Sequence, residues 1–333
     1  MRTPESRGNG NRTGWTTFAI ILSVSAVLAY IYFRQVGSPY LKERLELHGQ
    51  ILRGTAESPY RYRVLVPFIG EALTRALGAV LPGDRAFLLA YALYDLAAIL
   101  FLLGVLHRYL RAWFSNEQVL IGVLFAAATM PVALRDHYFQ PWSLLEAGLF
   151  TAGLLCIYRR RLWTLASIVA LASFNRETAV FIPLAFLFAH ASIGGTGESG
   201  RMPVRQTMLL FAGYCAIWAV IFFGLRAFLD GAQPVITLPE VFSRNTAPAV
   251  ILRAIMRAGL LFGAFWVFAA VGFRHAPGFV KRIALLAPLY LAAVLVWGMW
   301  HEVRLLMPLY AIVIPLGLSF LYRGRDASRR PDP

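Results

Sequence analysis

Long apolar runs separated by short polar segments occupy most of this 333-residue chain. A transmembrane helix needs about 17–25 residues, so the shorter runs would have to include flanking residues to cross a bilayer. The pattern predicts an all-α fold, a polytopic transmembrane helical bundle of about ten spans. The expected spans lie at 15–33, 86–106, 119–134, 144–158, 162–174, 179–193, 207–229, 258–273, 283–300 and 305–322.

The first run follows a polar segment and has no small-residue cleavage site after it. We therefore interpret it as a membrane anchor and not as a removed signal peptide. The predicted organisation is a cytoplasmic tail at 1–14, a single transmembrane domain at 15–322 and a cytoplasmic tail at 323–333. Within that domain, an outward loop at 34–85 follows the first span.

An amphipathic helix is expected at 41–53, early in this outward loop. At about 100° per residue, its leucines fall on one side, while Glu43 and Glu46 share the opposite, polar side. Gly54 and the following Ser-Pro pair end the helix. We predict that this helix lies on the membrane surface.

A second amphipathic helix is expected at 64–81. Its apolar side includes Leu65 and Ile69, and Glu71 and Arg75 form a pair four residues apart on the other side. The alternative for the whole loop is a solvated interfacial segment, anchored at the lipid headgroups by its aromatic and arginine side chains.

Positive charge is distributed unevenly between the two ends of the runs. Just over half of the 32 Lys and Arg residues fall in acid-poor segments on one predicted side of the membrane, for example at 159–161. The others are mixed with acids on the opposite side. Because cytoplasmic segments are enriched in Lys and Arg, this pattern predicts that both termini are cytoplasmic.

Composition agrees with a membrane protein, because 58% of the residues are hydrophobic and only 15% are charged. The net charge of +15 does not indicate nucleic-acid binding, since the basic clusters flank apolar runs. Cys156 and Cys215 lie inside apolar runs without metal-ligand spacing, so we expect packing residues and neither a disulfide nor a zinc site.

The outward connections collect most of the candidate chemistry. Their acids are Glu43, Glu46, Asp136, Glu177 and Glu302, their histidines are His48, His137 and His301, and their proposed phosphate-binding arginines are Arg61, Arg63, Arg176 and Arg304. A carboxylate can take the proton from an acceptor hydroxyl, and arginines can hold a phosphate and stabilise charge on it as it departs. This inventory suits the transfer of a group from a lipid-linked phosphate.

Each of these groups also has a structural interpretation. Glu43 and Glu46 could form the solvated face of an interfacial helix, and Arg176 with Glu177 could clamp two helices. Asp95 and Glu146 lie within apolar runs, where charge is costly and is usually functional. Either could instead be protonated, or bonded to a tyrosine such as Tyr91, and hold helices together.

Three short segments carry a resemblance to a known group. The chain resembles poorly characterised bacterial members of the GT-C superfamily of integral-membrane glycosyltransferases in three segments, 59–67 (PYRYRVLVP), 175–179 (NRETA) and 302–308 (EVRLLMP). Its layout of one span, a large outward loop and many further spans also resembles that group. The resemblance implies a location in the bacterial plasma (inner) membrane. It also implies a polyprenyl-phosphate sugar donor, an extracytoplasmic acceptor and inversion at the sugar carbon by one general base.

On this interpretation Glu46 is the base, with Glu43 and Asp136 as rivals. Phosphate or substrate would contact Arg61, Arg63, His137, Arg176, Glu177, Glu302 and Arg304. No cofactor or obligatory metal is predicted, although Asp136 with a loop glutamate could bind a divalent ion. The expected partners are the lipid-linked donor, membrane lipids and an extracytoplasmic acceptor.

One departure from the GT-C pattern leaves alternatives open. These transferases usually carry an aspartate in the first outward loop, and this chain has none before Asp84. The protein could therefore be an inactive scaffold. A different class is a transporter or flippase for lipid-linked or anionic solutes, with Asp95, Glu146 and the Arg176-Glu177 pair lining the path.

Overall fold

Helices form the whole architecture. The computed structural model describes residues 5–134, 140–190, 202–229, 231 and 237–323, and every element of regular secondary structure in these ranges is a helix. This confirms the all-α prediction. The predicted candidates Asp136 and His137 lie outside the described residues.

Six helical segments within the described ranges are long and apolar enough to cross a membrane. They are Gly14–Gly37, Gly83–Leu110, Asn116–Leu134, Val204–Phe228, Gly278–Trp297 and Val303–Leu321. A seventh arises if Pro248–Phe262 and Phe265–His275, which are bent by 69° relative to each other, count as one span. Several apolar helices of this length support a membrane protein.

The runs predicted at 144–158, 162–174 and 179–193 form shorter helices. These are α6 (Trp142–Tyr158), α7 (Leu162–Asn175) and α8 (Phe181–His190), the last preceded by the 3₁₀ turn η3 (Glu177–Val180). Length and composition thus support six or seven spans in the described chain, fewer than the ten apolar runs.

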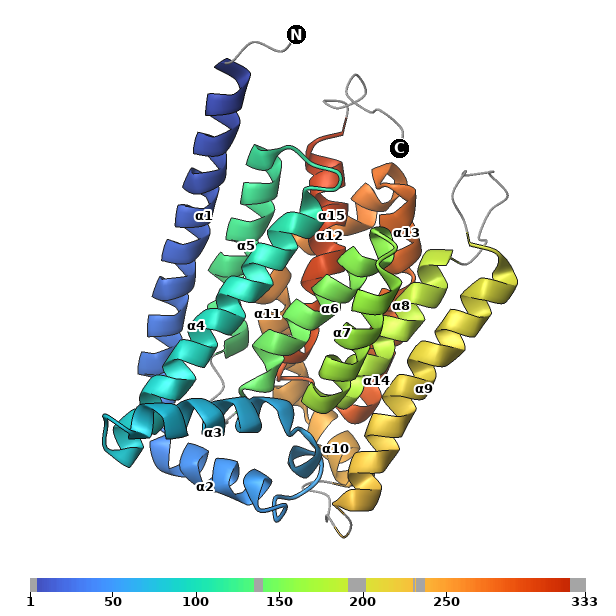
Figure 1. The fold of residues 1–333 in the computed structure, drawn as a ribbon. Helices are drawn as coiled ribbons and strands as arrows, with labels where there is room; N and C mark the ends of the chain where they lie inside the picture. The colour runs from blue at the N-terminus through green and yellow to red at the C-terminus, as the bar shows by residue number, and fades with distance from the viewer. Residues whose placement is uncertain (1–4, 135–139, 191–201, 230, 232–236, 324–333) are drawn as a thin grey trace.

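The remaining helices complete the bundle around a buried centre. They are α1 (Glu5–Tyr32), α4 (Gly83–Leu110), α5 (Asn116–Leu134), α9 (Val204–Phe228), α10 (Leu238–Asn245), α11 (Pro248–Phe262), α12 (Phe265–Gly272), α13 (Gly278–Ala284), α14 (Leu286–Trp297), η5 (Val303–Leu309) and α15 (Tyr310–Leu321). In the most apolar part of the η5 to α15 segment 94% of the residues are buried, whereas the share is 6% in α9, at the edge of the bundle (Figure 1).

Close packing at the centre depends on a missing side chain. Helices α12 and α15 approach so closely at Gly272 that a Cβ atom there would lie 2.0 Å from the Leu316 carbonyl oxygen. Only glycine fits such a backbone contact. The same packing buries α15 from Tyr310 to Ser319.

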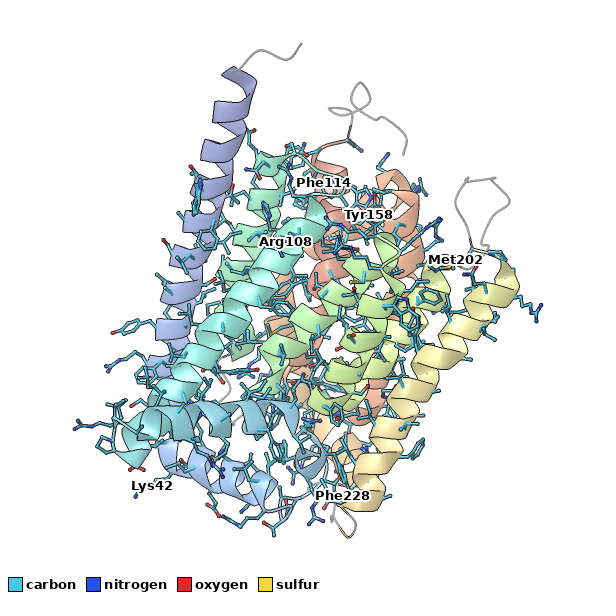
Figure 2. The ribbon with its side chains drawn as sticks, viewed as in Figure 1. Lys42, Arg108, Phe114, Tyr158, Met202 and Phe228 are labelled. Carbon is cyan, nitrogen blue, oxygen red and sulfur yellow. The ribbon has the colours of Figure 1, made fainter. Side chains whose placement is uncertain are left out.

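Two helices of the first loop lie across one end of this bundle (Figure 1). They are α2 (Leu41–Leu52) and α3 (Leu65–Gly78), which confirm that the two amphipathic segments are helical. Lys42 and Phe228 lie at this α2/α3 end, and Arg108, Tyr158 and Met202 lie toward the opposite end (Figure 2).

Helix α1 begins at Glu5, within the tail predicted at 1–14, and its apolar part ends in a π-helical turn, η1 (Phe33–Gly37). The start of α1 and the end of α15 lie at the same end of the bundle, opposite α2 and α3 (Figure 1). The loop that holds α2 and α3 therefore lies at the far end of the bundle from the start of α1 and the end of α15 (Figure 1).

Candidate functional site

The buried side of α2 carries two polar residues. Its leucines pack partly against the core, but the most buried positions are Arg44, His48 and Ile51. Arg44 and His48 lie on the side of the helix where the leucines were predicted to face. Arg44 packs over the ring of Tyr91, 5.2 Å from its centroid.

His48 connects α2 to two other helices. Its Nδ1 atom lies 2.9 Å from the Tyr91 hydroxyl on α4, and its Nε2 atom lies 3.1 Å from Glu71 on α3. Because the Glu71 carboxylate can only accept, Nε2 carries the proton and Nδ1 accepts from Tyr91. Burial lowers the pKa of His48 below its ordinary value, with Glu71 acting in the opposite direction.

Glu71 is held by two donors. It accepts from His48 and from Arg75, whose Nε lies 2.6 Å from the carboxylate, which confirms the predicted i,i+4 pair. These hydrogen bonds lower the pKa of Glu71. Tyr91 fits beside α3 because Gly70 has no side chain: a Cβ there would lie 2.7 Å from the Tyr91 hydroxyl.

A buried carboxylate follows one helical turn after Tyr91. Asp95 is 2% exposed, and its Oδ1 atom has no hydrogen-bond partner among the described residues. Arg44 of α2 and Arg304 of η5 are likewise buried, at 2% and 4% exposed, and Tyr32 at the end of α1 is 5% exposed. We refer to Tyr32, Arg44, Asp95 and Arg304 as the Asp95 cluster.

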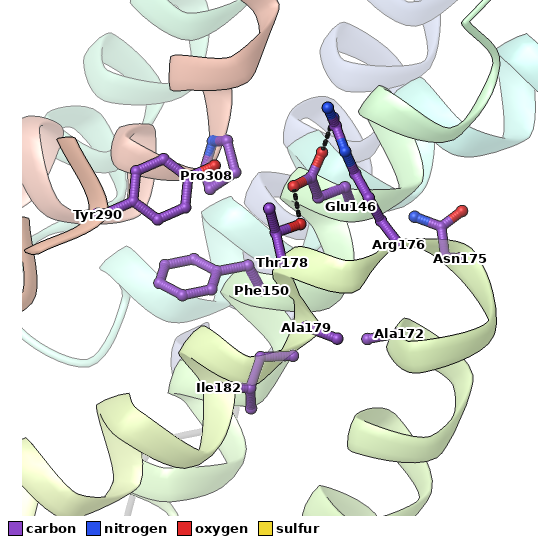
Figure 3. Close-up of a pocket in the computed structure, with 10 residues that line it drawn as sticks. All are labelled: Glu146, Phe150, Ala172, Asn175, Arg176, Thr178, Ala179, Ile182, Tyr290 and Pro308. Carbon is purple, nitrogen blue, oxygen red and sulfur yellow. Dashed lines mark hydrogen bonds and ion pairs between the residues drawn. The ribbon is translucent and has the colours of Figure 1, made fainter. Parts of the chain in front are cut away.

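A second charged group lies between α6 and the break that follows α7. Arg176 donates to Glu146 with an Nη1 to Oε2 distance of 2.5 Å, and both side chains are at least nine-tenths buried. Thr178 donates to the other oxygen of Glu146. Figure 3 shows Glu146 between these two donors. Both oxygens of the Glu146 carboxylate therefore accept a hydrogen bond, whereas Arg176 Nε has no partner among the described residues.

Glu177 forms its ion pair with a different arginine, Arg63. It accepts from both Nε and Nη2 of Arg63, with the Nε contact at 3.2 Å. The Arg63 guanidinium also stacks near Trp142, 5.4 Å from its centroid. The Glu177 side chain is 32% exposed, so this pair lies at the open edge of the group. We refer to Arg63, Glu146, Arg176 and Glu177 as the central ion-pair cluster.

Arg176 and Glu177 are adjacent in sequence but pair with different partners. Arg176 has extended backbone, with φ −164° and ψ 149°, at the end of α7. Successive side chains of an extended segment point to opposite sides. Arg176 therefore reaches Glu146 on α6, and Glu177 reaches Arg63 in the first loop.

Glu302 and Arg304, a predicted carboxylate and a predicted phosphate-binding arginine, pair with each other. Arg304 donates to Glu302 at 2.5 Å and is 4% exposed. Arg61 has a structural contact instead: its Nε donates to the Ala56 carbonyl and its Nη1 to the Leu229 carbonyl, at 2.9 and 3.2 Å. Arg61 thus ties the first loop to the end of α9.

The predicted bases in the first loop face away from both clusters. Glu43 and Glu46 are exposed on α2, on the opposite side from Arg44 and His48. Glu46 accepts a hydrogen bond from Gln50 at 3.3 Å. The positions of these glutamates fit the solvated helix face that the sequence also allowed.

One aromatic residue and one arginine correct the sequence interpretation. Trp142 is fully buried beneath Arg63. Arg226, which the sequence did not single out, lies over Phe222 and over Tyr62 of the first loop, 4.4 Å from the Tyr62 centroid. The contacts of Arg63 with Trp142 and of Arg226 with Tyr62 have no local sequence signal, since each joins segments far apart in the chain.

A small cavity adjoins the central ion-pair cluster (Figure 3). It is lined by Glu146, Phe150, Ala172, Asn175, Arg176, Thr178, Ala179, Ile182, Tyr290 and Pro308. Its interior has room for on the order of one water molecule, which excludes a sugar from this closed form. Among the described residues, no three His, Cys, Asp or Glu side chains converge as metal ligands.

Comparison of the chain with protein-family models, with curated proteins and with solved structures found no match. The functional argument therefore depends on the geometry of the two clusters. Together they bring four buried arginines to one region of a helical membrane protein.

Proposed function

We propose that this protein is a membrane glycosyltransferase of the GT-C type, which moves a sugar from a polyprenyl-phosphate carrier to an extracytoplasmic acceptor. One observation carries the proposal: four arginines from separate elements are buried near the α2/α3 end. Arg44, Arg63, Arg176 and Arg304 are 2%, 5%, 6% and 4% exposed. Buried guanidiniums are costly, and they favour the recognition of phosphate.

The open edge of the central ion-pair cluster is where a phosphate would bind. Arg63 presents two donors to Glu177, and a phosphate can accept the same two hydrogen bonds. Glu177 is one-third exposed and can turn to water when it is displaced. Arg176 remains held by Glu146 behind it. This exchange would place the charge of the lipid phosphate beside two guanidiniums.

The exposed apolar side of α3 supports a position on the membrane surface. Phe68 is 57% and Ile69 is 38% exposed, and neither faces the bundle. Lipid would cover these side chains. The distribution of basic residues supports cytoplasmic termini in a bacterial inner membrane, and the three short apolar helices α6 to α8 would raise the span count toward ten.

The general base is one of the three predicted carboxylates, Glu43, Glu46 and Asp136. Glu46 and Glu43 can receive an acceptor that arrives from water, but they face away from Arg63. Asp136 precedes Gln140, which donates to Tyr60, the ring beside Arg63.

The test is transfer from a panel of radiolabelled polyprenyl-phosphate sugars, in membranes containing wild type, Glu43→Gln, Glu46→Gln or Asp136→Asn. Glu57→Gln is the matched control, because Glu57 is an exposed carboxylate of the same loop. We expect Asp136→Asn to abolish transfer, while Glu57→Gln transfers normally. Absence of transfer from every donor by a folded wild type would contradict the proposal.

A transporter or flippase is the alternative, because Asp95 and Glu146 lie inside the bundle. Such a protein needs a path open in turn to both sides. Cysteines placed beside Asp95 and Glu146 would be labelled from both sides in a transporter and from the α2/α3 side alone in a transferase.

A further inference from the structure

Arg226 brings a positive charge to the edge of the bundle. It lies in the last turn of α9, two residues before Phe228 at the α2/α3 end (Figure 2). Its side chain is partly exposed, and no carboxylate among the described residues pairs with it. A cation at the lipid-facing edge of a membrane protein is costly unless an anion lies beside it. Arg226 therefore has room for a counter-charge that the described residues do not supply.

Two aromatic rings hold this guanidinium in place. It lies 3.4 Å from the centroid of Phe222 on its own helix and 4.4 Å from the centroid of Tyr62 in the first loop. Its Nη1 atom donates to the Phe222 carbonyl at 3.1 Å. A long side chain near a helix end can reach the lipid headgroups unaided, but it is then free to move. The rings fix the remaining N–H donors of Arg226, which lowers the entropy lost when they bind an anion.

The face of α9 that carries Arg226 also contacts η3. Trp218 stacks on Phe222, with ring centroids 4.7 Å apart, and its Nε1 atom donates to the Glu177 carbonyl at 3.1 Å. Residues four apart share a helix face, so Trp218, Phe222 and Arg226 form one stripe along α9. This stripe joins α9 to the protein at η3 and at the first loop.

Beside this stripe, α9 presents an apolar surface. Val220, Phe223 and Phe228 are 71%, 62% and 87% exposed. An anionic phospholipid matches both features, because its acyl chains are apolar and its phosphodiester carries a single negative charge, which one guanidinium balances. The lipid of the proposed donor is a phosphomonoester, with a charge of about −1.5 to −2 at neutral pH. That charge suits the two guanidiniums of the central ion-pair cluster instead.

We propose that Arg226, held by the rings of Tyr62 and Phe222, binds the headgroup phosphate of an anionic phospholipid in the leaflet at the α2/α3 end. The site does not depend on sugar transfer. A lipid bound there adds a contact where α9 meets the first loop. It therefore stabilises the attachment of a helix in whose most apolar part only 6% of the residues are buried.

The test is quenching of tryptophan fluorescence by bromine atoms on the acyl chains of phosphatidylglycerol, an anionic phospholipid. Purified protein is placed in phosphatidylcholine vesicles with an increasing share of the brominated lipid. The chain has eight tryptophans, so the signal of Trp218 is the difference between each protein and its Trp218→Phe counterpart. We expect half quenching at a share about tenfold lower for brominated phosphatidylglycerol than for brominated phosphatidylcholine, as one hydrogen-bonded charge pair provides.

Two variants separate a fixed guanidinium from general attraction. Arg226→Gln should lose the preference for the anionic lipid. Tyr62→Leu keeps the charge but removes a ring that holds it, and should lose most of the preference. Arg205→Gln is the matched control, because Arg205 is an exposed arginine at the other end of α9, and it should quench as wild type does. Quenching by brominated phosphatidylcholine should be the same in all of these proteins, which shows that each is inserted normally.

A preference that survives in Arg226→Gln, or that falls equally in Arg205→Gln, would overturn the site. An unchanged preference in Tyr62→Leu would overturn the role of the rings. Two unlabelled competitors identify the source of the phosphate, and neither polyprenyl phosphate nor inorganic phosphate should restore the Trp218 signal. Displacement by polyprenyl phosphate would overturn the assignment to a phospholipid, and displacement by inorganic phosphate would overturn the recognition of a lipid. Binding of polyprenyl phosphate by Arg63→Ala tests the proposed function separately.

Discussion

The central ion-pair cluster and the Asp95 cluster use the same kinds of side chain but differ in how they are satisfied. Glu146 and Glu177 each accept hydrogen bonds from a guanidinium on a distant element. In the Asp95 cluster, Arg304 pairs with its near neighbour Glu302, and an oxygen of Asp95 has no partner. The first arrangement fixes charge in place, whereas the second allows the charge to change.

This difference separates two uses of buried charge. A paired guanidinium can exchange its carboxylate for a phosphate without exposing a bare charge, so the central cluster suits anion binding. An enclosed carboxyl group can change its charge only by exchanging a proton. We therefore assign phosphate binding to Arg63.

The largest expected effect on stability is that of Arg176→Ala, which removes a guanidinium from the central ion-pair cluster. Removal of this guanidinium leaves Glu146 buried and charged without its partner, which costs about 3–5 kcal/mol of the free energy of unfolding. Denaturant unfolding of the purified protein measures this loss. Arg75→Ala is the control, because the Arg75 side chain is 79% exposed in its pair with Glu71, and its loss should be small. Equal losses in the two variants would mean that burial of the Glu146 pair has no energetic consequence.

Gly70→Ala tests the packing that places Tyr91 beside His48. The new Cβ would lie 2.7 Å from the Tyr91 ring, so the ring must move, at a cost of about 1–3 kcal/mol of unfolding free energy. Gly78→Ala in the same helix is the control, because nothing lies within 4 Å of that position. The prediction fails if Gly70→Ala is as stable as Gly78→Ala.

The smallest effect is the pH dependence contributed by His48 and Glu71. Both pKa values are lowered by folding, so the unfolded chain takes up protons that the folded chain does not. Stability should fall as the pH drops below 6.5, the ordinary value for His48, and further below 4.5, the ordinary value for Glu71. Thermal unfolding across this range should show a weaker dependence in His48→Gln. An unchanged slope in that variant would exclude His48 as a contributor.

Much of the fold could be predicted from local pattern. All ten apolar runs became helices, and the amphipathic segment 41–53 matches α2 to within one residue at its end. The side of that segment predicted to be apolar is also the side that is buried. Arg44 and His48 lie on it, and that position was the available signal that they are buried.

Pairings between distant segments could not be predicted. Arg176 and Glu177 are adjacent in sequence, yet they bind partners about 30 and 114 positions away. The sequence pattern shows that charge lies near the membrane but not which helix supplies its counter-charge. For the same reason the burial of Trp142 under Arg63, which lies in the first loop, could not be predicted.

The most direct test of the central claim is binding of polyprenyl phosphate to the purified protein, with the uncharged polyprenol as the matched ligand. We predict that wild type prefers the phosphate and that Arg63→Ala loses about 10- to 100-fold in affinity for it, as expected for lost hydrogen bonds to a charged group. Arg75→Ala should bind as wild type does. Equal affinity for the two lipids, or full affinity in Arg63→Ala, would contradict a phosphate site at the open edge of the central ion-pair cluster.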